Sequence, residues 1–166
     1  MVIMNTNTDT VSHGTDIRFS PRNFQWLPAL EAGFLAGLVL MIVPRGSPWS
    51  ALTFFAPVVM GRVVPEAAGI PLILTKAMHL ILAISYGFII SAIVMRITQM
   101  RAIVVGAIVG LALYFANWAV IDAAFPEMKG DEITVAFTHM VFGAIAAGAY
   151  RGLLWRRISS ETNETP

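Results

Sequence analysis

The stretch that decides the fold is 102–121, AIVVGAIVGLALYFANWAVI, in which 20 consecutive residues carry no charge. An α-helix rises about 1.5 Å per residue, so a segment of this length spans a hydrocarbon core of roughly 30 Å. An uncharged run this long is typical of a transmembrane helix. It predicts that at least this part of the chain crosses a bilayer.

The composition of the 166-residue chain extends this prediction to the whole protein. Hydrophobic residues make up 57% and charged residues 13%, whereas soluble domains average about 45–50% and 25%. The mean hydropathy is +0.72, and a soluble domain of this size has too little interior to hide so much apolar surface. The net charge of +1 and the absence of cysteine exclude nucleic-acid binding through a basic surface and a disulfide-stapled secreted fold. We therefore predict an integral membrane protein, with the lipid bilayer as its first partner.

Three further apolar segments flank the deciding stretch. The predicted spans cover residues 24–43, 70–95, 102–121 and 133–155. They give an all-α membrane domain over 24–155 with four transmembrane helices. Residues 1–23 are polar and lack the basic start and apolar core of a signal peptide. We expect 1–23 and 156–166 to be cytoplasmic tails.

The segment between the first two spans, 44–69, contains the apolar piece 51–61. Eleven residues are too few for a crossing helix, and Pro57 interrupts them. We predict a short amphipathic insert, either flat at the membrane surface or re-entrant. A re-entrant insert would have to pack against the bundle, because irregular backbone cannot face lipid.

The distribution of lysine and arginine predicts the orientation, because cytoplasmic loops collect these residues. One side of the four-span arrangement holds seven of them: Arg18, Arg22, Arg96, Arg101, Arg151, Arg156 and Arg157. The other side holds Arg45, Arg62 and Lys129, together with the acidic residues Asp122, Glu127, Asp131 and Glu132. Both termini are therefore predicted to be cytoplasmic.

Small residues four apart indicate where helices pack closely, because this spacing stacks them on one helix face. The candidate packing residues are Gly33 and Gly37, Gly106 and Gly110, and Ala144, Gly148 and Gly152. Such stripes favour tight pairing within the chain or between copies of it in a homo-oligomer. The alternative is that glycine is simply frequent in membrane helices.

Several polar residues are predicted to share one layer in the outer half of the bundle. The depths of His79 and His139 differ by only about 5 Å when counted along their helices. Lys76 and His79 share a helix face with Tyr86, although Lys76 can alternatively extend to the headgroups. The full candidate layer is Lys76, His79, Tyr114, Asn117, Thr138 and His139.

Glu31 lies in the inner half of the bundle, away from this layer. Because it follows Pro28 closely, it fits an acid at a helix start, where the helix dipole favours negative charge. Its alternative role is that of a proton or cation site, since an ionisable group within a span is a functional candidate.

The chemistry that this layer can support is limited. His79 and His139 are the minimum for bis-histidine haem b ligation. No carboxylate or cysteine joins them for a metal site, and Ser85 and Thr138 lack the acidic third member of a catalytic triad. We assign no catalytic residue, no metal and no cofactor, and expect no enzyme.

Three functions remain. The favoured one is an accessory or structural membrane protein, alone or in a larger membrane complex. The second is a small-solute or ion permeation unit acting as an oligomer, and the third is electron transfer through haem.

Five segments carry a resemblance to a known group of proteins: LEAGFLAG (30–37), GSPW (46–49), AMHLILAISYG (77–87), GLALY (110–114) and THMVFGAIAAGAYR (138–151). Together they resemble small four-helix bacterial inner-membrane proteins of unknown function, which automatic labels sometimes call sodium-solute symporters. This chain shows no symporter motif. The resemblance implies a bacterial cytoplasmic membrane and supplies no activity.

Overall fold

The fold consists of four helices, as the apolar segments predict. The computed structural model describes residues 24–42, 58–59, 62–63, 71–124, 126 and 131–163. The helices are α1 (Trp26–Ile42), α2 (Leu72–Val94), α3 (Gln99–Ala124) and α4 (Glu132–Asn163). Within the described ranges, α2, α3 and α4 are long and apolar enough to cross a membrane, and α1 is a shorter apolar helix.

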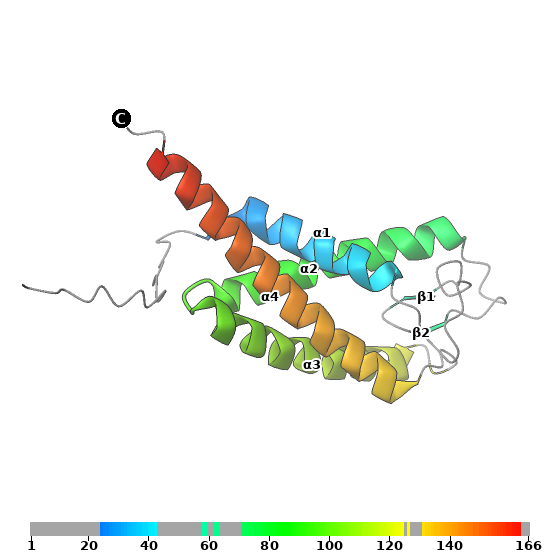
Figure 1. Cartoon of the computed structure of the whole chain (residues 1–166). Helices are drawn as coiled ribbons and strands as arrows, with labels where there is room; N and C mark the ends of the chain where they lie inside the picture. Colours follow the sequence, from blue (N-terminus) through cyan, green and yellow to red (C-terminus); the bar gives the residue numbers. More distant parts are fainter. Residues whose placement is uncertain are drawn as a thin grey trace, which may run out of the picture.

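The helices lie side by side in a bundle, with α4 in contact with each of the other three (Figure 1). The most extensive contact is between α3 and α4, followed by that between α1 and α2. A short turn over residues 95–98 makes α2 and α3 antiparallel. Arg151 of α4 donates a hydrogen bond to the carbonyl of Met95 at 3.0 Å, and so caps the end of α2.

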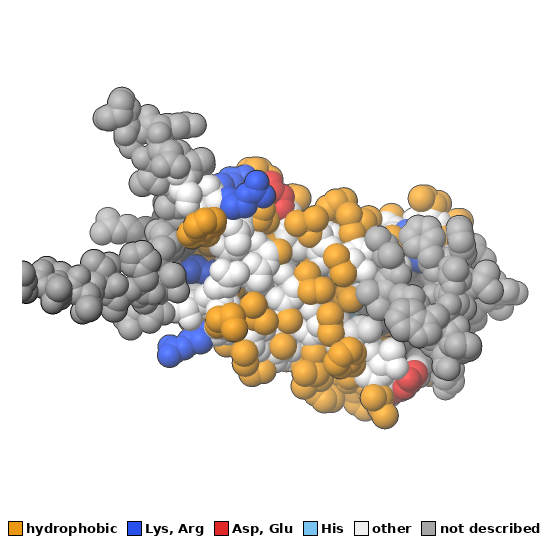
Figure 2. Space-filling model, in the orientation of Figure 1, with side chains coloured by type: hydrophobic (Ala, Val, Ile, Leu, Met, Phe, Trp, Pro, Cys, Tyr) orange, Lys and Arg blue, Asp and Glu red, His pale blue; other side chains and the backbone are white. Residues whose placement is uncertain are grey.

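The interior of the bundle contains many small residues beside a few large ones such as Ile90 and Tyr150, and many large apolar side chains lie on its exterior. Ala29, Ala32 and Ala36 of α1 and Ala146 and Ala147 of α4 are fully buried. Bulky side chains cover the outside, as the hydrophobic atoms on the visible face in Figure 2 show. Examples of these exposed residues are Ile73, Ile81, Val104, Ile108, Phe115 and Phe137. A soluble bundle would bury more of its large apolar side chains, so this arrangement is compatible with helices that pack within lipid.

Glycines allow the close approach of two helix pairs. A Cβ on Gly33 of α1 would lie 2.8 Å from the carbonyl oxygen of Ala83 in α2. In α3, a Cβ on Gly106 or Gly110 would overlap the carbonyl oxygens of Gly143 and His139 respectively. Gly37 also meets the side chain of Ala83. The glycine pairs predicted in the first and third spans therefore lie at contacts within the chain.

Helix α4 packs through a different stripe from the predicted one. Gly143 and Ala147 face α3, whereas Gly148 makes only ordinary contact with the side chain of Ile103, 3.4 Å from an added Cβ. An added Cβ on Gly152 would meet nothing within 4 Å. The sequence contains two stripes of small residues on α4, one with Gly143 and Ala147 and one with Ala144, Gly148 and Gly152. Helix α3 packs against the first.

The described part of the predicted insert is extended rather than helical. β1 (Val58–Val59) and β2 (Arg62–Val63) pair antiparallel, with Val58 opposite Val63 and Val59 opposite Arg62. An interfacial or re-entrant helix is the expectation for 51–61, so Val58 and Val59 correct it. The β-branched valines provide the physical reason, since they favour extended backbone. The rest of the insert lies outside the described residues, as does the tail over 1–23.

Helix α4 continues past the predicted span end at residue 155 and reaches Asn163. No glycine or proline interrupts residues 156–163, so nothing in this part of the sequence ends the helix. The first part of the predicted C-terminal tail is therefore helical.

Candidate functional site

The candidate site centres on His139, in the first third of α4. Its Nδ1 atom lies 2.8 Å from the carbonyl oxygen of Val135, one turn earlier. A carbonyl oxygen only accepts hydrogen bonds, so Nδ1 carries the proton. The opposite ring atom, Nε2, is then an acceptor, and the Nδ2 amide of Asn117 donates to it at 2.9 Å. His139 is thus held as a neutral imidazole of one defined tautomer.

The hydrogen bonds continue from Asn117 to a third helix. The hydroxyl of Tyr86 in α2 donates to Oδ1 of Asn117. The chain of donors and acceptors therefore runs from Tyr86 through Asn117 to His139 and ends on the Val135 carbonyl. We call these four residues the polar network. It joins α2, α3 and α4 at one level of the bundle.

Tyr114 flanks the polar network on the side of α3, one turn before Asn117. Its ring meets the imidazole of His139 edge-on, with centroids 5.8 Å apart and an interplanar angle of 63°. Its hydroxyl donates to Oε2 of Glu132, the first residue of α4, at 2.9 Å. Tyr114 therefore fixes the start of α4 against α3 while covering one side of His139.

Three of the six residues in the predicted layer come together directly: Tyr114, Asn117 and His139. Thr138 adjoins them, and its buried hydroxyl donates to the same Val135 carbonyl at 2.8 Å. His79 lies elsewhere, with Nε2 3.2 Å from the carbonyl oxygen of Gly37 in α1.

Lys76, the sixth member, is half-buried one turn before His79 on α2. The residue of α2 at the level of His139 is Tyr86, seven positions beyond His79 and about 10 Å further along the helix.

The two histidines thus serve different helix contacts. His79 faces α1, whereas His139 faces α3 and has both ring nitrogens in hydrogen bonds. Haem ligation by this pair would require both sets of bonds to break. Among the described residues, no group of three or more His, Cys, Asp or Glu side chains could hold a metal ion.

Glu31 forms an ion pair rather than acting at a helix start. It lies in the second turn of α1, and its Oε1 atom is 3.8 Å from Nη2 of Arg157 near the end of α4. The expectation of a first-turn acid is therefore wrong. Both side chains are about 40% exposed, so the pair adds little stability.

Sequence reasoning missed two hydrogen-bonding partners at this site: Tyr86 of the polar network, and Glu132, which accepts from Tyr114. Tyr86 was assigned to the face of His79, and Glu132 to an acidic loop. An antiparallel pairing of α3 with α4 would have placed Glu132 on the side of the second half of α3, which contains Tyr114.

Comparisons with known protein families, curated proteins and solved structures return no match for this chain. The polar network consists of uncharged donors and acceptors that bond one another across three helices.

Proposed function

We propose that this chain is a multi-pass protein of the bacterial cytoplasmic membrane with an accessory or structural role. Its membrane placement is supported by the three long apolar helices and by the large apolar side chains on their outer faces. The bacterial assignment is supported only by the resemblance of the five sequence segments given above.

The proposal includes α1 as a fourth crossing. With 17 residues, α1 is at the short end of the range of about 17–25 that spans a bilayer. It lies against both α2 and α4, and its buried alanines form part of the common interior. These contacts support a position of α1 beside α2 and α4 within the same apolar layer.

Both termini are proposed to be cytoplasmic. The turn between α2 and α3 and the end of α4 lie at the same end of the bundle and carry arginines (Figures 1 and 2). The described residues concerned are Arg96, Arg101, Arg151, Arg156 and Arg157. Asp131 and Glu132 lie at the opposite end, so the asymmetry follows the positive-inside rule.

The observation that supports a structural role is the way the polar network is satisfied. Both ring nitrogens of His139 and both ends of the Asn117 amide are used in contacts within the bundle. Hydrogen bonds between these groups fix the register of three helices. Releasing either residue to bind a solute or ion would leave its buried or half-buried partners without these hydrogen bonds.

The experiment compares stability with flux in the same variants. Asn117→Ala and His139→Ala should each lower the thermal stability of the purified protein in detergent. Proteoliposomes of wild type and variants should show equal leakage of ions and small solutes, at the level of empty liposomes.

Two outcomes would replace the structural role. Solute flux through wild-type proteoliposomes that either variant changes would establish the permeation unit. A Soret band in the visible spectrum of the wild type that is lost in His79→Ala and in His139→Ala would establish the haem protein.

A further inference from the structure

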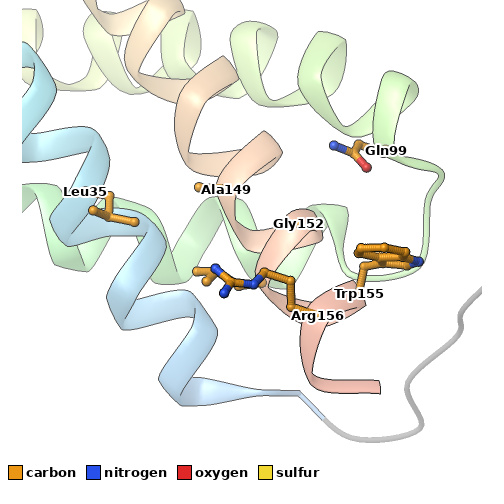
Figure 3. Close-up of a pocket in the computed structure, with 7 residues that line it drawn as sticks. Leu35, Gln99, Ala149, Gly152, Trp155 and Arg156 are labelled. Carbon is orange, nitrogen blue, oxygen red and sulfur yellow. The ribbon is translucent and has the colours of Figure 1, made fainter. Parts of the chain in front are cut away.

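An open groove crosses the outer face of α4 near the arginine-rich end of the bundle. It has a volume of about 420 Å³. Leu35 of α1 borders it on one side and Gln99, at the start of α3, on the other (Figure 3). Gly152, Trp155 and Arg156 of α4 lie between them.

The centre of the groove is open because α4 has small residues there. An added Cβ on Gly152 would meet no other heavy atom within 4 Å. Ala149 also lines the groove, and Leu35 and Leu153 make its flank apolar. The groove can therefore take an alkyl chain lying against α4.

Arg156 is the charged residue that lines the groove. The neighbouring arginines are engaged elsewhere: Arg157 pairs with Glu31, and Arg151 donates to the carbonyl of Met95. Within the part of the chain that the structure describes, no carboxylate pairs with Arg156. Its guanidinium, which chelates phosphate oxygens well, is left at the groove.

The groove also lies where a lipid headgroup would be. Trp155 is 53% exposed beside Arg156, and exposed tryptophan is typical of the membrane–water interface. Arg96 and Arg101 add positive charge at this end of the bundle. Basic pockets between transmembrane helices on the cytoplasmic side attract anionic headgroups.

We propose that the groove binds an anionic phospholipid, with the phosphate on Arg156 and an acyl chain over Gly152. The assignment depends on the proposed membrane placement. A second copy of the chain is a poorer occupant, because two copies paired in parallel across Gly152 would bring their Arg156 side chains together. Like charges at such a contact oppose association.

The test uses brominated lipids, which quench tryptophan fluorescence on contact. The chain has four tryptophans, so Trp26→Phe, Trp49→Phe and Trp118→Phe together leave Trp155 as the only reporter. This variant is reconstituted into vesicles in which either phosphatidylglycerol or phosphatidylcholine carries the bromine, at matched mole fractions. One arginine near a membrane surface gives about a fivefold preference for anionic lipid. To reach the same degree of quenching, brominated phosphatidylglycerol should therefore need about one fifth of the mole fraction that brominated phosphatidylcholine needs.

Matched variants separate the groove from its surroundings. Arg156→Ala should abolish the preference, and Gly152→Leu should reduce it by filling the groove. Arg157→Ala removes the same charge from the next residue, outside the groove, and should keep the preference.

The remaining outcomes overturn one proposal or both. Equal quenching by the two lipids refutes the lipid site and leaves the membrane placement intact. No quenching by either lipid refutes both. A change in oligomeric mass on Gly152→Leu, with the lipid preference retained, assigns the groove to a second copy.

Discussion

His139 shows how a polar side chain is accommodated within an apolar bundle. An unpaired polar group in such surroundings is unfavourable, by roughly 1–3 kcal/mol in protein mutational data. His139 avoids this cost because its Nδ1 donates to the Val135 carbonyl and its Nε2 accepts from the Asn117 amide. The hydroxyl of Tyr86, on a third helix, donates to the other end of the Asn117 side chain. Each member therefore depends on the others.

This dependence can be measured with a double-mutant cycle of Tyr86→Phe and Asn117→Ala. We expect a coupling free energy of about 0.6 kcal/mol and no more than about 1.7 kcal/mol, the average and the maximum found for hydrogen bonds between membrane helices. The measurement is unfolding of the purified protein in mixed micelles. Ser85→Ala is the control for Tyr86→Phe, because Ser85 is exposed and bonds only the Ile81 carbonyl of its own helix. A coupling of zero would show that Tyr86 and Asn117 act independently.

Glycine packing gives a second prediction. Gly143→Ala should destabilise the protein by about 1–3 kcal/mol, the usual range for overpacking, because the added methyl overlaps the Gly106 carbonyl. Gly152→Ala introduces the same methyl on the same helix where nothing lies within 4 Å. Thermal unfolding in detergent should separate the two variants clearly. Equal melting temperatures would contradict the close α3–α4 contact.

The sequence allowed part of this detail to be predicted. Asn117 and His139 could be placed together because helix rise converts residue number into depth. Tyr86 could not be distinguished from His79, because both lie on one face of α2 and only the offset between helices decides which meets His139. The stripe that α4 uses, Gly143 with Ala147, was likewise undetermined, since small residues occupy two of its faces.

Helix α4 has a well-defined start, which depends on Asp131. The hydroxyl of Thr134 donates to Oδ2 of Asp131 at 2.5 Å, and the backbone N–H of Val135 donates to the Asp131 carbonyl at 2.8 Å. The hydroxyl bond, followed by backbone N–H bonds from Thr134 and Ile133, lowers the pKa of Asp131 below its ordinary value of 3.8. These bonds favour the charged carboxylate, as in an N-cap.

The pH dependence follows from the sign of this shift. Because the folded pKa is depressed, the contribution of Asp131 to stability is present above pH 3.8. It is lost as the pH falls below that value through the lowered folded pKa. Thr134→Val removes the hydroxyl but keeps the branched shape, so the pKa of Asp131 should rise part of the way back. Thr134→Ser should restore the low pKa. Carboxyl NMR titration of Asp131 gives the result, and an unchanged pKa in Thr134→Val would show that the hydroxyl bond is unimportant.

The existence of the four helices was predictable because apolar length is a strong signal, whereas the segment between α1 and α2 was not. The valines of β1 and β2 look the same in a short apolar helix and in a hairpin when read from hydropathy alone. Their antiparallel backbone pairing sets Val58 opposite Val63, and hydropathy does not encode such a register. The predicted span ends at residue 155, whereas α4 ends at Asn163. Hydropathy indicates where the apolar segment ends, and the helix continues beyond that point.

For the whole molecule, the deciding question is whether α1 crosses the bilayer. α2, α3 and α4 make three candidate crossings, and three crossings alone would put the start of α2 and the end of α4 on opposite sides. If α1 also crosses, residues before Trp26 return to the side of the α4 C-terminus. The number of crossings is odd without α1 and even with it. Locating the two chain ends relative to the membrane therefore shows whether α1 crosses.

We expect both ends to be cytoplasmic. Single cysteines introduced at Asn5 and Thr165, in a chain that has no native cysteine, should resist a membrane-impermeant maleimide added to intact spheroplasts and react after lysis. A third cysteine in place of Pro126, at the opposite end of the bundle between α3 and α4, should react from outside without lysis. Labelling at Asn5 but not at Thr165 in intact spheroplasts would mean that α1 does not cross. Its packing against α2 and α4 would then have to place the apolar α1 in the membrane without a complete passage, as a re-entrant helix.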